Sequence, residues 1–344
     1  MSNVDRDFDR RQMLGLIGAG AVVSASLPLA GCASSADAKT LTVGGLAVTC
    51  NLTLPVACEA NAAASGGKGH AQFSYQKFSG WPEVKESLMS GDLQAAYMLA
   101  PLVMDLADKK VPVKIVSIGH RSGAVIMVRT DSSYRNFRDL VGKRVAVPSR
   151  FAVDYLFLSK MLAQEGMTTR DVQIVEMAPA DMPAALYVKG VDAYCTGEPF
   201  GAAAQKAGYA RVLRMTRNEW PRYMCCVLTV REELIKSNRP LVQTMVDYVL
   251  GAGIWLDSGP QHREKAIEIA ATKPYFNQDP AILRFVMTNP SDRVTYGDLR
   301  MVPKEFDDLM EMSVAAGNLK HPVRYSTYVD DSFATAGKPA TINI

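Results

Sequence analysis

The stretch Gly80–Ala107, GWPEVKESLMSGDLQAAYMLAPLVMDLA, contains the pattern that decides the fold. Residues 81–91 carry apolar side chains at helical spacing, residues 95–99 form a short apolar run, and residues 101–109 return to helical spacing. A strand between two helices is the unit from which a largely parallel sheet covered by helices is built. The stretch therefore predicts an α/β protein.

The same alternation continues on both sides of this stretch. Upstream, strand-like and helical runs alternate as TLTVGGLAV (40–48), PVACEANAAA (55–64) and FSYQKFS (73–79). Downstream, the strand-like runs VPVKIVSIG (111–119) and AVIMVR (124–129) flank His120–Gly123, and the alternation then restarts and continues to ARVLRMT (210–216). After CCVLTV (225–230) the pattern is almost wholly helical.

A chain of 344 residues exceeds what one hydrophobic core usually covers, so we expect two lobes. The pattern places lobe 1 at 40–128, lobe 2 at 129–227, a mostly helical return to lobe 1 at 228–335 and a tail at 336–344. The two crossings between lobes are predicted near Met127–Arg129 and Val227–Thr229. A cleft between such lobes commonly holds a small ligand, and hinge closure around that ligand is a standard motion.

The N-terminal stretch DRRQMLGLIGAGAVVSASLPLAGCASS (9–35) has a basic start, an apolar middle and a small-residue exit, which is typical of a cleaved export signal. It resembles a bacterial twin-arginine signal, through Arg10 and Arg11, fused to a lipoprotein cleavage box that ends at Cys32. We therefore expect a signal peptide at 1–31, a lipid on Cys32, a tether at 32–39, and a periplasmic protein anchored to a bacterial membrane. The alternative is an ordinary helix that ends at a chance cysteine.

The composition excludes several classes of protein. A hydrophobic content of 48% and a charged content of 21% exclude a disordered chain, and a net charge of +3 is too small to indicate nucleic-acid binding. The sequence has no G-x-S-x-G, H-E-x-x-H or helix-opening G-x-G-x-x-G motif, so we expect no enzyme activity and no cofactor.

The cysteines and histidines form no recognised metal-binding pattern along the sequence. Apart from Cys32, the cysteines are at positions 50, 58, 195, 225 and 226, and the four histidines are at 70, 120, 262 and 321. We therefore predict no metal site. Most of the cysteines are interpreted as small buried hydrophobic residues, and a Cys50–Cys58 disulfide is an alternative in an oxidising compartment.

The ligand site should lie in the strand-to-helix turns. Ligands of open α/β sheets bind beyond the carboxyl ends of the strands, where helix N-termini also favour anions. The predicted ligand-binding residues are Asn51, Leu52, Trp81, Leu99, Ala100, Arg121, Ser122, Ser149, Phe151, Thr196, Gly197 and Glu198.

Several of these residues have a structural alternative. Ser149 could cap a helix, and Trp81 before Pro82 could be a hydrophobic staple rather than a ligand wall. Arg121 could clamp an anion or pair with an acidic residue, and Glu198 could bind a ligand or cap the next helix. His120 is interpreted as a structural histidine rather than a ligand residue.

Four stretches together resemble one family: Gly80–Ala107, GKRVAVPSRFAVDYLFLSKMLAQEG (142–166), DAYCTGEPFGAAAQKAG (192–208) and CCVLTVREELIKSNRPLVQTMVDYVLGAG (225–253). They are similar to periplasmic solute-binding proteins of ABC importers, in the group that binds nitrate, bicarbonate, sulfonates, taurine and thiamine precursors. The resemblance implies the type II periplasmic-binding-protein fold, in which two lobes each have a mostly parallel sheet flanked by helices and a helical C-terminal region packs on lobe 1.

The resemblance also implies a function. The chain would be a monomeric receptor that captures a small oxyanion, a sulfonate or a thiamine-precursor-like molecule and delivers it to an ABC permease in the inner membrane. Trp81 and Gly197 match the positions at which the nitrate and bicarbonate binders contact the anion, whereas the stretch that would carry their anion-binding histidine reads Ser149–Phe151. The alternatives are a sensor partner of a signalling kinase and an exported enzyme.

Overall fold

The computed structural model describes residues 40–344. The predicted export signal, the lipid anchor at Cys32 and the tether at 32–39 lie outside the described residues. Within the described part of the chain, no helix combines the length and the apolar character that crossing a lipid bilayer requires.

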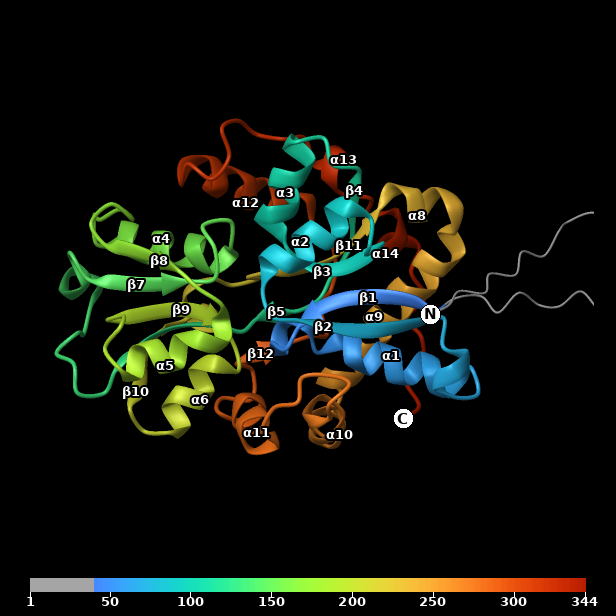
Figure 1. The fold of residues 1–344 in the computed structure, drawn as a ribbon, viewed down its shortest axis with the longest axis horizontal. Helices are drawn as coiled ribbons and strands as arrows, with labels where there is room; N and C mark the ends of the chain where they lie inside the picture. The colour runs from blue at the N-terminus through green and yellow to red at the C-terminus, as the bar shows by residue number, and fades with distance from the viewer. Residues whose placement is uncertain (1–39) are drawn as a thin grey trace, which may run out of the picture. The chain divides into compact units, whose positions relative to one another are not determined.

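The first lobe is built on a five-stranded sheet with the order β2-β1-β3-β11-β4 (Figure 1). Its strands are β1 (Leu41–Leu46), β2 (Phe73–Phe78), β3 (Ala95–Leu99), β4 (Val113–Ile118) and β11 (Cys226–Arg231), and its helices are α1 (Thr53–Ala64), α2 (Trp81–Ser90) and α3 (Ala100–Asp108). All five residues of the central strand β3 are buried, because helices cover both faces of the sheet there. The edge strand β2 is mostly half-buried or exposed.

The second lobe repeats this plan with the strand order β10-β6-β9-β7-β8. Its strands are β6 (Ala124–Arg129), β7 (Arg144–Val147), β8 (Gln173–Glu176), β9 (Ala193–Gly197) and β10 (Ala210–Met215), and its helices are α4 (Val153–Gln164), α5 (Met182–Tyr187), α6 (Phe200–Lys206) and α7 (Thr216–Glu219). In Figure 1, α4 lies on one side of this sheet and α5 and α6 lie on the other.

Each sheet has four strands in one direction and one reversed strand. In the first sheet, β11 runs antiparallel to β3 and β4, while β1 is parallel to β2 and β3. In the second sheet, β6 runs antiparallel to β9 and β10, while β7 is parallel to β8 and β9. The reversed strand is in both cases the one by which the chain enters the sheet from the other sheet.

The predicted crossing points at Met127–Arg129 and Val227–Thr229 fall inside these reversed strands, in β6 and β11. The chain itself passes between the sheets through residues 119–123 and 216–225. The prediction placed the crossings late because each apolar entering strand continues the pattern of the strands before it, which periodicity alone cannot separate.

The C-terminal region is helical and packs mainly on the first lobe. Its helices are α8 (Glu232–Ser237), α9 (Arg239–Asp257), α10 (Pro260–Ala271), α11 (Pro280–Thr288), α12 (Pro303–Ala315), α13 (Tyr325–Tyr328) and α14 (Ser332–Ala336). Helix α9 packs on α1, and α12 and α13 pack on α3, whereas α11 contacts α6 of the second lobe (Figure 1). The short strand β12 (Val294–Thr295) pairs with β5 (Arg121–Ser122) in the first crossing.

The run of helical sequence from 231 to 258 is interrupted at Asn238, which separates α8 from α9. The Asn238 side chain accepts a hydrogen bond from the Leu241 N–H at 3.2 Å and so caps the start of α9. Pro240 follows in the first turn of α9, where its missing N–H costs no hydrogen bond.

Gly253 in α9 allows a close approach that no other residue would permit. A Cβ atom at this position would lie 2.4 Å from the Tyr296 carbonyl oxygen and 2.8 Å from the Leu299 side chain. We expect Gly253→Ala to lower the free energy of unfolding by about 1–3 kcal/mol, because overpacking forces the backbone apart. Urea denaturation tests this, with Gly69→Ala as the control, since a Cβ at Gly69 meets nothing within 4 Å. Equal midpoints for the two variants would contradict the prediction.

Candidate functional site

A small cavity between the two lobes, here called the inner cavity, has a volume of about 10 Å³. This volume is at the lower limit of what can hold one water molecule. The first lobe and the segment that enters it contribute Val48, Cys50, Trp81, Leu99, Cys225 and Cys226. The second lobe contributes Pro148, Asp154, Pro179, Thr196 and Gly197.

Two wider grooves lie beside the inner cavity. The Trp81 groove has a volume of about 350 Å³ and is lined by residues 79–83, 148, 149 and 176–179. The Phe200 groove has a volume of about 470 Å³ and is lined by residues 46–48, 77–79, 178–181, 200, 276 and 278. Trp81, Pro148 and Pro179 border both the Trp81 groove and the inner cavity, so the larger solvent-facing space adjoins the smaller enclosed one.

The inner cavity carries polar atoms without a partner. Among the described residues, Asp154 Oδ1 and Thr196 Oγ1 are buried and have no hydrogen-bond partner. Burial raises the pKa of Asp154 well above its usual range, and nearby cysteine thiolates act in the same direction. Because a buried polar atom without a partner costs free energy, such atoms in a cavity favour a ligand that satisfies them.

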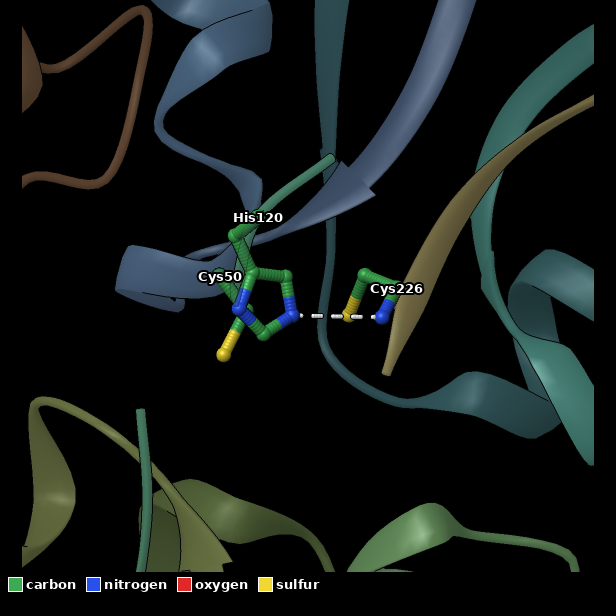
Figure 2. Close-up of side chains that lie close together, drawn as sticks. All are labelled: Cys50, His120 and Cys226. Carbon is green, nitrogen blue, oxygen red and sulfur yellow. Dashed lines mark hydrogen bonds between the residues drawn. The ribbon is translucent and has the colours of Figure 1, made fainter. Parts of the chain in front are cut away.

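Cys50, His120 and Cys226 lie close together (Figure 2), and Cys50 and Cys226 also line the inner cavity. One donor atom from each side chain lies within 4.8 Å of the others, and all three residues are buried. Cys50 lies in the turn after β1, His120 lies between β4 and β5, and Cys226 begins β11. Sequence positions 50, 120 and 226 are thus brought together only by the topology.

The histidine ring is held in one orientation. Its Nδ1 is 2.7 Å from the Ser122 carbonyl oxygen, and its Nε2 is 3.2 Å from the Cys226 amide nitrogen. A carbonyl can only accept and an amide N–H can only donate, so Nδ1 carries the proton and the lone pair of Nε2 accepts the Cys226 N–H. Ser122 itself has a positive φ of 59°, a conformation that is rare outside glycine and that directs this carbonyl.

The two cysteines of this cluster have different thiol acidities. A hydrogen bond from Cys226, together with the nearby His120, lowers the pKa of Cys50 to about 5 despite its burial. Burial raises the pKa of the Cys226 thiol well above its usual range. The Cys50 thiol is therefore the more acidic of the two.

The two lobes also touch directly beside the site. The Thr49 N–H and Oγ1 both donate to the Glu198 carbonyl oxygen, at 2.8 and 3.0 Å. Thr49 belongs to the turn after β1, and Glu198 follows β9 of the second lobe. Opening of the lobes would have to break these two hydrogen bonds.

Comparison with known proteins places the chain in a family. The model of the NMT1-like family matches residues 34–271, which is more than half of the chain. The chain belongs to the NMT1-like family.

This NMT1-like chain has relatives among proteins of nitrate import. It is 28% identical over 217 residues to the nitrate import ATP-binding protein NrtC of Synechococcus elongatus, covering 58% of this chain and 33% of NrtC. It is 24% identical over 272 residues to the nitrate/nitrite binding protein NrtA of Nostoc sp., covering 72% of this chain and 60% of NrtA. The NMT1-like chain thus spans about a third and about three fifths of these two proteins.

Solved structures confirm the predicted fold class. The chain superposes on the ligand binding component of an ABC-type import system from Staphylococcus aureus with zinc bound, with a TM-score of 0.78, 24% identity and coverage of 88% of this chain and 99% of that one. The alkanesulfonate-binding protein SsuA from Xanthomonas axonopodis pv. citri bound to MOPS has a TM-score of 0.71, 19% identity and coverage of 85% and 98%. The desulfurization enzyme DSZB has a TM-score of 0.59, 17% identity and coverage of 86% and 98%.

The NMT1-like fold brings five of the predicted ligand residues to the interlobe space. Trp81, Leu99, Thr196 and Gly197 line the inner cavity, and Ser149 lines the Trp81 groove with Trp81. Trp81 starts α2 and is only 4% exposed, and it lines both the inner cavity and the Trp81 groove. Thr196 and Gly197 end β9 and face the first lobe.

Five other predicted residues line neither the inner cavity nor the two grooves. Their observed contacts are local: the Asn51 Oδ1 accepts from the Leu46 N–H, Leu52 is buried, the Ala100 N–H donates to the Cys225 carbonyl, the Ser122 N–H donates to the Tyr223 carbonyl, and the Phe151 N–H donates to Ser149 Oγ. These contacts stabilise the turns, and the five residues do not line the interlobe space.

The side chains of Arg121 and Glu198 are held in ion pairs, and neither residue lines the inner cavity or the two grooves. Arg121 pairs with Glu305 at 2.8 Å, and the Glu198 carboxylate contacts Arg293 and accepts from the Ala202 N–H at 2.8 Å. The acidic-partner alternative for Arg121 and the capping alternative for Glu198 are therefore the ones that the contacts favour.

The sulfur-rich side of the site has no signature in the sequence. Cys50 lies in one of the strand-to-helix turns predicted to hold the ligand, but the sequence pattern predicts only a small buried hydrophobic role for its thiol. Cys225 ends the second crossing and Cys226 begins β11, and no sequence signal places them opposite Cys50. The five cysteines in the described part of the chain are all buried free thiols, so the structure contains no Cys50–Cys58 disulfide.

Proposed function

We propose that the protein is the solute-binding component of an ABC importer and holds a small solute between its two lobes. The inner cavity and the adjoining Trp81 groove of about 350 Å³ together carry this proposal, because residues of both lobes line them and Asp154 and Thr196 of the inner cavity have buried polar atoms without partners. The proposed solutes are oxyanions such as nitrate or bicarbonate, sulfonates, and thiamine-precursor-like molecules. The proposed partner is a membrane permease, which accepts the solute from the closed form.

The two crossings between the lobes form the hinge about which the second lobe closes over the solute. The first lobe binds the solute at the turns after β1 and β3 and beside Trp81, and the second lobe then closes with Thr196 and Gly197 over it. A solute can favour closure only through contacts that exist in the closed form alone. The second-lobe contacts are of this kind.

We further propose that the protein works as a monomer in the periplasm, where a lipid on Cys32 holds it at a bacterial membrane. The basic and apolar N-terminal sequence with its Leu29–Cys32 cleavage box supports this location. Mass spectrometry of the protein from membranes tests the anchor, since a diacylglycerol on an N-terminal Cys32 has a defined mass.

The solute class can be tested by thermal shift of the purified protein. Nitrate, bicarbonate, an alkanesulfonate and a thiamine-precursor pyrimidine serve as probes. A solute present at about 100 times its dissociation constant should stabilise the protein by about 2.7 kcal/mol. A response to none of the four probes, together with turnover of an ester or a sulfinate, would replace this proposal by that of an enzyme, an alternative favoured by the buried Cys50–His120 pair.

Trp81 should dominate the affinity for the solute. We expect Trp81→Ala to raise the dissociation constant about 30-fold, because a buried aromatic anchor at the centre of a binding site typically contributes about 2 kcal/mol or more. Isothermal titration measures this change. Trp255→Ala is the matched control, since Trp255 stacks on His262 in the C-terminal helices and lines neither groove nor cavity. Equal affinities of the two variants would remove Trp81 from the site.

A further inference from the structure

We propose that Cys50, His120 and Cys226 form a binding site for a thiophilic metal ion, with Zn²⁺ as the defining probe, beside the inner cavity. This proposal rests on the proposed function, because it assigns a ligand chemistry to the same interlobe site. It goes beyond that function by placing an ion, rather than only an organic or oxyanionic solute, against the first lobe.

The donor set fits a soft or borderline cation. Two thiol sulfurs and one imidazole nitrogen lie within 4.8 Å of one another, and this combination is typical of Zn²⁺ or Cu⁺. Hard cations such as Mg²⁺ and Ca²⁺ prefer oxygen ligands, which the three side chains do not offer. Tetrahedral zinc has Zn–S distances of about 2.3 Å and Zn–N distances of about 2.0–2.1 Å, so the three donor atoms need to close by only roughly 1 Å.

The histidine is prepared for coordination by its neighbours. Its Nδ1–H donates to the Ser122 carbonyl at 2.7 Å, which is the hydrogen bond that usually orients a metal-binding histidine. Its Nε2 lone pair points to the Cys226 segment, where it accepts the amide N–H at 3.2 Å (Figure 2). An ion between the side chains would replace this amide proton as the partner of Nε2.

The cavity offers a fourth position on the side of the second lobe. Cys50 and Cys226 border the inner cavity, whose volume of about 10 Å³ admits one ion or water. Across this cavity lie Asp154 Oδ1 and Thr196 Oγ1, which are buried and have no partner among the described residues. These two atoms are the second, independent observation that points to a ligand here.

The arrangement divides the ligands between the lobes. All three donors belong to the first lobe and its crossing segment, so the open form could bind the ion with three ligands. Closure would then bring Asp154, Thr196 or a solute donor atom to the fourth position. An ion held in this way would link solute binding to closure, because only the closed form completes its coordination.

The test uses the purified protein, stripped of metal by a chelator and kept reduced. Titration with Co²⁺ should give one equivalent of binding, with a sulfur-to-cobalt charge-transfer band in the near ultraviolet and the visible bands of a four-coordinate ion. Zn²⁺ should displace the cobalt. Cys50→Ser and Cys226→Ser should each weaken Zn²⁺ binding by more than about 100-fold, since even loss of a residue that only supports a ligand costs 10–100-fold.

Cys58→Ser is the matched control, because Cys58 is an equally buried free thiol on α1 that does not join the cluster. This variant should bind Zn²⁺ like the unmodified protein. The cobalt spectrum of the unmodified protein needs no variant, so the test holds even where a serine substitution prevents folding. Absence of a charge-transfer band, or unchanged binding in both Cys50→Ser and Cys226→Ser, would overturn the proposal.

The two proposals can fail separately. A thermal shift with an oxyanion or sulfonate in the metal-free protein, without any Co²⁺ or Zn²⁺ binding, would overturn the metal site and leave the solute-binding function standing. Metal binding without a response to any solute would support the metal site and overturn the proposed organic and oxyanionic solutes.

Discussion

Replacement of Arg293 by methionine should lower the free energy of unfolding by about 3–5 kcal/mol, because it leaves the buried Glu198 carboxylate without its positive partner. Arg293 is 1% exposed and Glu198 is fully buried. The guanidinium contacts the carboxylate through two nitrogens, and it also donates to the Asn289 carbonyl at 2.9 Å and to Gln205 Oε1 at 3.2 Å. Urea denaturation followed by circular dichroism measures the loss.

The position of this ion pair explains the size of the effect. Arg293 lies between α11 and β12 of the C-terminal region, whereas Glu198 and Gln205 belong to the second lobe. The pair therefore fastens the C-terminal helices to the second lobe next to the point where Thr49 contacts the Glu198 carbonyl. Its loss would disturb both the fold and the closed arrangement of the lobes.

The pH dependence of Arg293→Met gives a second measure. Burial raises the pKa of Glu198, and the charge of Arg293 only partly offsets this rise. A carboxyl whose pKa is higher in the folded than in the unfolded protein contributes fully to the stability of the fold below its unfolded pKa of about 4.3. This contribution is lost as the pH rises through the folded pKa. Arg293→Met raises the pKa of Glu198 further. The loss in free energy of unfolding, relative to the unmodified protein, should therefore be larger at pH 8 than at pH 5.

Two further variants isolate the buried charge. Glu198→Gln combined with Arg293→Met should be more stable than Arg293→Met alone and should lack the added pH dependence, since no ionisable group is then left unpaired. Arg284→Ala is the control, because Arg284 pairs with Glu264 at the surface and exposed pairs contribute little. A deficit for Arg293→Met that matches this control, or that shrinks at higher pH, would contradict the prediction.

The sequence predicts the fold correctly wherever the spacing of apolar residues fits only one type of secondary structure. The buried run at 95–99 and the helical runs beside it became β3, α2 and α3 because apolar periodicity reports directly on burial. The entering strands β6 and β11 show the limit of this reasoning. Their apolar residues predict strands, but the sheet that each strand joins depends on contacts with residues far away in the sequence.

The site shows the same limit more strongly. Trp81, Thr196 and Gly197 could be placed at the interlobe space because they end strands or begin helices, where the topology itself puts ligands. The cluster of Cys50, His120 and Cys226 could not, because its three members come from segments with no fixed spacing. Arg121 and Glu198 lie in the same kind of turn as Trp81, but each forms an ion pair with a residue far away in the sequence.

Arg121→Met should lower the free energy of unfolding by about 3 kcal/mol or more, because Arg121 joins both crossings to the C-terminal region. Its guanidinium donates to the Arg222 carbonyl in the second crossing and to the Asp298 and Arg300 carbonyls, each at 2.9 Å. It also pairs with Glu305 at 2.8 Å while being only 5% exposed. Urea denaturation measures the loss, and Arg300→Ala is the control, since the Arg300 side chain contacts Asp298 of the same segment from a largely exposed position.

Arg121→Lys separates the geometry of the guanidinium from its charge. A lysine keeps the positive charge beside Glu305, but its single ammonium cannot reach three carbonyls that the planar fork of arginine serves together. If the fork holds the crossings, Arg121→Lys should lose most of the stability that Arg121→Met loses, and small-angle scattering of the folded fraction should show more separated lobes. A lysine variant as stable as the unmodified protein would reduce Arg121 to a partner of Glu305.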